Sequence, residues 1–117
     1  MKILMVDDSD ITRELMKTFL QDMGHQVVGE AENGKEAVEA YAKLKPDLVL
    51  MDLVMPGKTG LEALQEIIAA DPSAKVVMVT AVQQDAMSQE LLSKGAIAVL
   101  RKPFSYPELA EVLKPFS

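Results

Sequence analysis

Short apolar runs alternate with helical patterns along the chain, and this alternation restricts the fold more than any other feature of the sequence. Continuous apolar runs are typical of strands that are buried on both faces of a parallel sheet. Such runs occur at Ile3–Val6, Val27–Val28 with its flanks, Leu48–Met51, Val76–Val79 and Ile97–Leu100. Because each run is followed by a helical pattern, the sequence predicts βαβ units, and therefore a doubly wound α/β fold with five parallel strands and five helices.

The expected helices have recognisable starts and stops. The second opens with Asn33 and Glu36, a pair that resembles a capping box. The third runs from Leu61 to Asp71-Pro72, the fourth from about Gln83 to Lys94, and the fifth from about Pro107 to Leu113, where Pro115 ends it. The first stops at Gly24, and its predicted apolar face consists of Ile11, Leu15, Phe19, Leu20 and Met23.

Length and composition restrict the class of protein. A chain of 117 residues is long enough for one domain with its own core, so we expect residues 1–117 to form a single domain. The absence of cysteine excludes disulfides and thiolate metal sites. A formal net charge of −6 disfavours nonspecific nucleic-acid binding, and no apolar run reaches the roughly 18 residues of a membrane span. We therefore expect a soluble, cytoplasmic protein.

Polar side chains follow four of the five apolar runs. Asp7 and Asp8 follow the first, Asp52 ends the third, Thr80 and Ala81 end the fourth, and Lys102-Pro103 follows the fifth with Arg101. Ligand sites of doubly wound sheets lie outside the carboxyl ends of the strands, at a point where the strand order reverses. If the first strand is central, the three acids share one pocket there.

Asp52 is a lone carboxylate between the apolar runs Leu48–Met51 and Leu53–Met55. Burying an ionised carboxylate is costly unless it is paired, and three neighbouring carboxylates favour protonation or a bound cation. Oxygen ligands alone suit a hard metal, best Mg²⁺, which leaves positions for phosphate oxygens. Lys102 and the Thr80 hydroxyl would then be donors to an anion, and an Asp52 oxygen would attack phosphorus as a nucleophile.

Each of these residues also has a purely structural interpretation. The acids after the first run are followed by Ser9 and Asp10, either of which would cap a helix. Gly57 and Gly60 are interpreted as turn residues, and His25 as a surface residue rather than a ligand. Glu30 and Glu32, near the end of the second run, have no evident role. The functional interpretation depends on the joint pattern at the strand ends.

This joint pattern resembles the response-regulator receiver domain, the CheY-like phosphoacceptor of two-component signalling. Nearly the whole chain takes part, through the segments "ILMVDDS", "AENGKEAV", "PDLVLMDLVMPGKTG", "VVMVTA", "KGA" and "RKPF". The resemblance implies a flavodoxin-like, CheY-like sheet with strand order 2-1-3-4-5. It also implies that a phosphohistidine on a sensor histidine kinase or phosphotransfer protein donates a phosphoryl group to this domain.

The resemblance assigns roles to the metal ligands. Asp52 is the implied phosphoacceptor, Asp8 binds Mg²⁺ directly, and Asp7 binds it mostly through water. The backbone carbonyl of Val54 is the further implied ligand, and Mn²⁺ is a possible substitute for Mg²⁺.

The resemblance also implies which groups hold the phosphoryl oxygens: Thr80, Ala81 and Lys102. The bond between Lys102 and Pro103 is implied to be cis, which is a modest cost for an X-Pro bond. Beyond this self-catalysed transfer and a slow dephosphorylation, the family implies no enzyme activity.

The implied output is a remodelled surface on the fourth helix, fifth strand and fifth helix, which controls a downstream protein. No nucleic acid or membrane insertion is expected, and the chain is expected to be a monomer or weak dimer. The family usually has an aromatic switch residue where this chain has Val99, so helix movement is expected to replace the aromatic rotamer change. Val54 and Val82 are expected to tune the phosphoryl lifetime, and Tyr106 is a candidate exposed aromatic for partner contact.

Two other functions compete with the receiver interpretation. An aspartyl-nucleophile phosphatase of the haloacid-dehalogenase type needs a second acid two residues after its nucleophile, where this chain has Val54. The other alternative is a non-switching interaction scaffold on the same fold, which would not need this set of residues together: Asp7, Asp8, Asp52, Thr80 and Lys102. Both alternatives are therefore less favoured than a phosphorylation switch.

Overall fold

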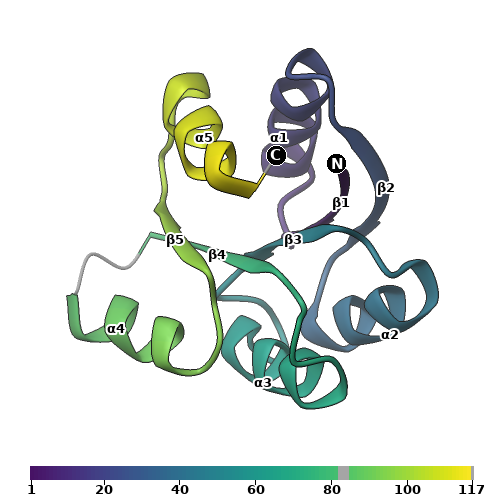
Figure 1. Ribbon diagram of the computed structural model, residues 1–117, viewed down its shortest axis with the longest axis vertical. Coiled ribbons are helices and arrows are strands. Elements are labelled where there is room, and N and C mark those ends of the chain that lie inside the picture. The colour runs from purple at the N-terminus through teal and green to yellow at the C-terminus, as the bar shows by residue number, and fades with distance from the viewer. Residues whose placement is uncertain (82–84, 117) are drawn as a thin grey trace.

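The computed structural model describes residues 1–81 and 85–116 of the chain. Its centre is a parallel sheet in the order β2-β1-β3-β4-β5, with helices on both faces (Figure 1). The predicted doubly wound fold and strand order are therefore confirmed. The strands are β1 (Lys2–Val6), β2 (Gln26–Ala31), β3 (Leu48–Asp52), β4 (Val76–Thr80) and β5 (Ala98–Arg101).

The helices form one layer on each side of the sheet (Figure 1). One layer contains α1 (Asp10–Asp22) and α5 (Tyr106–Leu113), and the other contains α2 (Gly34–Leu44), α3 (Gly60–Ala70) and α4 (Asp85–Ser93). A short 3-10 helix, Lys114–Phe116, follows α5. The predicted start of the fourth helix at Gln83 lies outside the described residues. Within the described ranges, none of these helices has both the length and the apolar character that crossing a bilayer requires.

Each helical layer encloses its own hydrophobic core against the sheet. Successive side chains of a strand point to opposite faces. Leu4 and Val6 therefore join the core under α2, α3 and α4, while Ile3 and Met5 join the core under α1 and α5. β3 and β4 are buried at every position, which explains their nearly unbroken apolar sequence. The polar exceptions are Asp52 and Thr80, the last residues of β3 and β4, and both are buried.

Side-chain caps determine where several helices begin. The Asn33 carboxamide oxygen accepts a hydrogen bond from the Glu36 N–H at 2.9 Å, which confirms the predicted start of α2. At α3, Thr59 and Glu62 form a reciprocal capping box, and α5 begins with the same arrangement. An N-cap contributes about 1 kcal/mol to helix stability. These caps therefore help to hold α3 and α5 beside the carboxyl edge of the sheet.

The buried face of α1 differs from the sequence prediction in its first turns. Ile11 is 83% exposed and Leu15 is 46% exposed, whereas Met16, Leu20 and Arg13 are buried. The buried positions 13, 16 and 20 have helical spacing, but the first of them is a cation. The prediction of the apolar face was wrong at Ile11 and Leu15 because it considered apolar residues alone.

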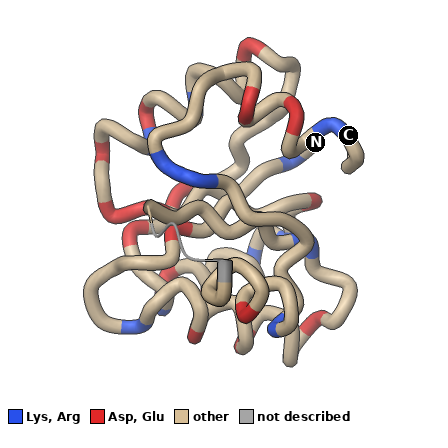
Figure 2. The backbone as a smooth tube through the Cα atoms, turned by 90° about the vertical axis from the view of Figure 1, so that its left-hand side faces the viewer, with Lys and Arg blue, Asp and Glu red and all other residues tan. Residues whose placement is uncertain are grey.

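Basic and acidic positions are interspersed along the chain in the view of Figure 2. Nonspecific binding to nucleic-acid phosphates depends on neutralisation by many Lys and Arg residues. The interspersed charges and the formal net charge of −6 do not favour that kind of contact.

Candidate functional site

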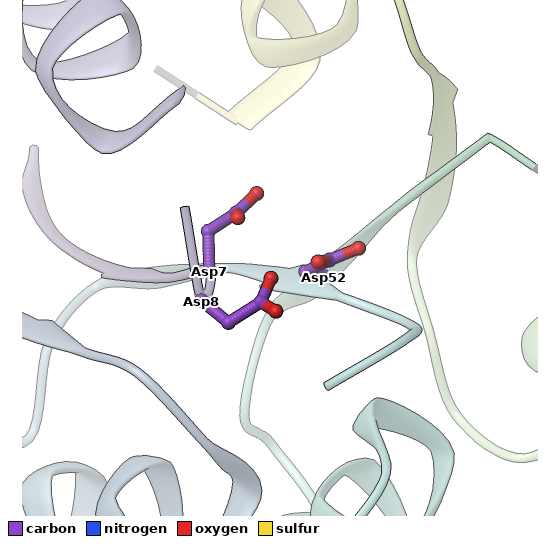
Figure 3. A group of neighbouring side chains, drawn as sticks. All are labelled: Asp7, Asp8 and Asp52. Carbon is purple, nitrogen blue, oxygen red and sulfur yellow. The ribbon is translucent and has the colours of Figure 1, made fainter. Parts of the chain in front are cut away.

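Three carboxylates lie at the carboxyl edge of the sheet (Figure 3). Asp7 and Asp8 follow β1, and Asp52 ends β3, the neighbouring strand, in which Met51 is opposite Val6. One ligand oxygen from each acid lies within 4.8 Å of the others. The fold thus brings together the three acids that the sequence analysis placed in one pocket, and their oxygen-only donor set suits a hard divalent cation.

Asp7 is fully buried, and both of its carboxylate oxygens accept hydrogen bonds. The Ser9 backbone N–H donates to Oδ1 at 2.8 Å, and the Lys102 ammonium donates to Oδ2 at 2.6 Å. Asp8 is exposed. The two consecutive acids therefore have different environments, since one carboxylate is held by the protein and the other faces solvent.

Asp52 is 6% exposed, and its Oδ1 lies 3.4 Å from the Lys102 Nζ. Burial raises the pKa of Asp52, the positive charge of Lys102 lowers it, and the negative charge of Asp7 raises it, with a net shift above the ordinary value. Lys102 thus bridges Asp7 and Asp52. A single ammonium offsets part of the cost of burying two carboxylates. The pKa of Asp52 is still raised, so Lys102 does not fully offset the cost of burying the Asp52 charge.

The ends of β4 and β5 complete the site. Thr80 is buried at the end of β4, and Ala81 follows it in an exposed position. The Lys102 N–H donates to the Thr80 carbonyl at 2.8 Å, which fixes the loop after β5 against the end of β4. The peptide bond between Lys102 and Pro103 is cis. The predicted candidates Thr80, Ala81 and Lys102 therefore lie at one edge of the sheet with the acids.

The valines of the sequence analysis occupy different positions. Val54 is 67% exposed after β3, and its backbone N–H hydrogen-bonds the Asp52 carboxylate, which lowers the pKa of Asp52. Val99 is half-buried on β5 and packs against the core under α2, α3 and α4. Val82 lies outside the described residues.

Gly60 has a role that the sequence analysis missed. A Cβ atom at this position would lie 2.1 Å from the Asp52 carbonyl oxygen and 2.8 Å from the Leu53 Cα. The Gly60 N–H also donates to the Leu53 carbonyl at 2.9 Å. Gly60 therefore permits the start of α3 to contact the backbone of Asp52, whereas Gly57, at φ +72°, is a turn residue as interpreted.

A buried arginine next to the acids was also missed. Arg13 lies on α1 and contacts Glu30 and Glu32, the two acids for which the sequence offered no role. The helical spacing of Arg13 with Met16 and Leu20 was the signal that could have identified it as an inward-facing residue.

Two minor predictions are corrected. Tyr106 is half-buried, its ring packs edge-on against Phe19 with centroids 5.3 Å apart, and its hydroxyl donates to Asp22 at 2.8 Å. It is therefore part of the contact between α5 and α1 rather than an exposed aromatic. His25 was predicted to lie on the surface, but it is half-buried, and its Nδ1 lies 3.0 Å from the terminal amine of Met1.

The fold and the acid cluster define a CheY-like α/β domain with a candidate cation site. The family model described as "Response regulator receiver domain" matches residues 3–114. The chain therefore belongs to the response regulator receiver domain family, whose members are signalling proteins of two-component systems.

Similar proteins agree with this membership. The chemotaxis protein CheY of Listeria monocytogenes is 45% identical over 114 residues, or 97% of this chain and 96% of that protein. CheY of Thermotoga maritima is 41% identical over 116 residues, or 99% of this chain and 97% of that protein. Among solved structures, a chain of the CheX-CheY-BeF3-Mg²⁺ complex from Borrelia burgdorferi aligns with a TM-score of 0.96 and 28% identity, which covers 99% of this chain and 89% of that one.

Proposed function

We propose that the protein is a phosphorylation-dependent switch in which Asp52 accepts a phosphoryl group. The donor is a phosphohistidine on a sensor histidine kinase or a phosphotransfer protein. The observation that carries this proposal is the setting of Asp52, a buried carboxylate 3.4 Å from an ammonium and beside two further acids. Carboxylates this close repel one another unless a cation is bound or a proton is shared. The cluster is therefore better explained by binding than by a structural role.

The cation of this proposal is Mg²⁺, with Mn²⁺ as a substitute. Asp7, Asp8, Asp52 and the backbone carbonyl of Val54 would hold it. The donor set fits, because hard cations prefer oxygen ligands and the three carboxylates offer oxygens within 4.8 Å of one another. When bound, the ion would offset negative charge on the phosphoryl oxygens. The Borrelia CheY complex contains Mg²⁺ and BeF3, which supports the same choice here.

In the transfer, an Asp52 oxygen forms a bond to phosphorus while the bond from phosphorus to the donor histidine nitrogen breaks. Burial raises the pKa of Asp52, and the Lys102 ammonium counteracts this rise, so Lys102 favours the ionised nucleophile. After transfer, Lys102, the Thr80 hydroxyl and the Ala81 backbone would donate to the phosphoryl oxygens. Phosphoryl transfer depends mainly on positioning and charge stabilisation, and these residues at the strand ends supply both.

The output of the switch is a change of the surface formed by α4, β5 and α5, which controls a protein partner. The phosphoryl group draws the Thr80 side chain inward and shifts the population between two states. Val99 is β-branched and small, so a change of its rotamer would alter the surface little. Movement of α4 therefore transmits phosphorylation to the partner. Slow loss of the phosphoryl group to water resets the switch. Residues 1–117 act as one domain, as a monomer or weak dimer, in the cytoplasm with the kinase.

Mass spectrometry after incubation with acetyl phosphate and Mg²⁺ tests the proposal. We expect the mass of one phosphoryl group, lost on treatment with base as an acyl phosphate is. The matched control is Asp52→Asn, which keeps the size of the side chain and should gain no mass. Equal modification of the wild-type protein and this folded variant would show that Asp52 is not the acceptor.

A further inference from the structure

Arg13 is a buried cation outside the set of residues that bind the phosphoryl group or Mg²⁺ in the proposed function. Its side chain is 9% exposed although it lies in the first turn of α1. The guanidinium Nη1 donates to the backbone carbonyl of Asp7 at 2.5 Å, in a buried hydrogen bond. A buried arginine is rare without partners, so its contacts indicate what it supports.

Three acids hold the guanidinium in this orientation. The Arg13 Nε donates to Glu30 at 3.1 Å, and Nη2 lies 3.5 Å from Glu32 and also pairs with Asp10. These acids come from α1, from β2 and from the loop after β2. A planar guanidinium has five donors in a fixed fork, so several acids can fix its plane and leave one N–H for the Asp7 carbonyl.

The Asp7 carbonyl belongs to the peptide that joins Asp7 to Asp8. Because a peptide unit is planar, a hydrogen bond to its oxygen restricts the rotation of the whole unit. It therefore also restricts the direction in which the Asp8 side chain points. The Asp7 side chain is already fixed by Ser9 and Lys102. Asp8 is exposed, and the orientation of its backbone sets the direction from which its carboxylate reaches the site.

We propose that Arg13 is a positioning residue for the cation site, which acts by holding the Asp7–Asp8 peptide so that both acids face Asp52. This inference rests on the proposed function, because it assumes that the three acids bind Mg²⁺. Glu30 and Glu32 act on the cation site indirectly, because they orient the Arg13 guanidinium. Loss of a group that orients metal ligands typically weakens metal binding by about 10- to 100-fold.

Calorimetric titration with Mg²⁺ alone, on the full chain, tests this role. We compare Arg13→Met, which keeps an apolar stem and removes all donors, with Arg13→Lys, which keeps one charge and can still donate to the Asp7 carbonyl. Lys17→Met is the matched control, because Lys17 lies on the same helix and pairs with Glu30 at 3.8 Å without a hydrogen bond to Asp7. We expect a Kd for Mg²⁺ about tenfold higher for Arg13→Met, partial rescue by Arg13→Lys, and no change for Lys17→Met.

The outcomes separate this inference from the proposed function. If the wild-type protein does not bind Mg²⁺ at millimolar concentrations, the proposed function fails first and the inference fails with it. If the wild-type protein binds Mg²⁺ and folded Arg13→Met binds within twofold of it, Arg13 is only structural and the inference is wrong. If Arg13→Met does not fold, Arg13→Lys decides, because an ammonium can donate to the Asp7 carbonyl but cannot keep the planar fork that Glu30 and Glu32 orient. A Kd at least threefold above that of Lys17→Met then supports the positioning role of the guanidinium, and an equal Kd overturns it.

Discussion

The two sides of the candidate site are anchored differently. On the side of β1 and β3, Asp7 is fixed through both carboxylate oxygens, and Arg13 holds its carbonyl. On the side of β4 and β5, Leu91 is the one buried side chain among residues 86–93 of α4, and β5 is buried at Leu100 alone. α3, which follows β3, is better anchored than α4, because it buries Ala63, Leu64 and Ile67 and begins with a capping box.

This difference matches what each side would do in the proposed switch. Groups that bind a cation and receive a phosphoryl group need fixed positions, because transfer depends on their geometry. An element that reports the reaction must change state at low cost, and moving elements are drawn from the less stable parts of a protein. The four predictions that follow test the anchored side and the contacts that Lys102 makes with it, from the largest expected effect at neutral pH to the smallest.

The largest effect is expected at Gly60. Gly60→Ala places a Cβ against the Asp52 carbonyl, which belongs to a buried central strand and cannot yield, so we expect a loss of about 3 kcal/mol of unfolding free energy. Gly57→Ala is the control, since no atom lies within 4 Å of its Cβ position and only the positive φ disfavours alanine, at about 1 kcal/mol. Urea denaturation measures both. Equal losses would mean that α3 does not depend on close contact with β3.

Lys102→Ala is expected to cost about 2 kcal/mol in the absence of metal. Removing one partner of a buried ion pair costs about 3 to 5 kcal/mol, and the 23% exposure of the Lys102 side chain reduces this figure. Added Mg²⁺ should then stabilise the variant more than the wild-type protein, because the negative charges of Asp7 and Asp52 are no longer offset by the Lys102 ammonium. Urea denaturation with and without Mg²⁺ measures this. The control is Lys58→Ala, whose pair with Glu66 is more exposed and should contribute less than about 1 kcal/mol. The prediction is wrong if the two variants lose the same stability.

Mg²⁺ itself should stabilise the wild-type protein by about 1.4 kcal/mol at ten times its Kd, because it binds the native state alone. Asp8→Asn should remove most of this gain and should slightly stabilise the metal-free protein, since it relieves repulsion among the acids. Thermal melts over a Mg²⁺ series measure both effects. A Tm that does not respond to millimolar Mg²⁺ would contradict the assignment of the cation site.

The effect that is smallest at neutral pH concerns the far end of the anchored side, because it develops only at alkaline pH. The Tyr41 hydroxyl of α2 donates to Asp71 at the end of α3 at 2.7 Å, and burial together with this hydrogen bond raises the pKa of Tyr41 to about 12. An unfolded tyrosine ionises near pH 10, so this contribution to stability is present below about pH 10 and is lost between about pH 10 and pH 12. Urea midpoints should therefore fall more steeply there for the wild-type protein than for Tyr41→Phe. Parallel curves would show that this hydrogen bond is not made.

Much of the fold followed from the sequence because its causes are local. Apolar runs such as Val76–Val79 are a direct consequence of burial on both faces, and the cap at Asn33 depends on residues three positions apart. The gathering of Asp7, Asp8 and Asp52 could also be predicted, because parallel strands end at one edge of the sheet.

The residues that the sequence did not reveal depend on contacts between distant segments. Gly60 looks like any turn glycine until α3 is placed against β3. Arg13 interrupts an apolar face and becomes explicable only when Glu30 of the neighbouring strand lies beside it. Tyr106 likewise appears to be a surface residue until α5 packs against Phe19 of α1.

NMR shift mapping of the protein with Mg²⁺ and beryllofluoride, a phosphoryl mimic, tests the central claim most directly. The account predicts that the largest changes occur at Thr80 and along α4, that Arg13 and its neighbours on α1 change little, and that Val99 keeps its rotamer. An unchanged α4 together with a rotamer change at Val99 would contradict the account, because the weakly anchored helix would then not be the element that reports phosphorylation.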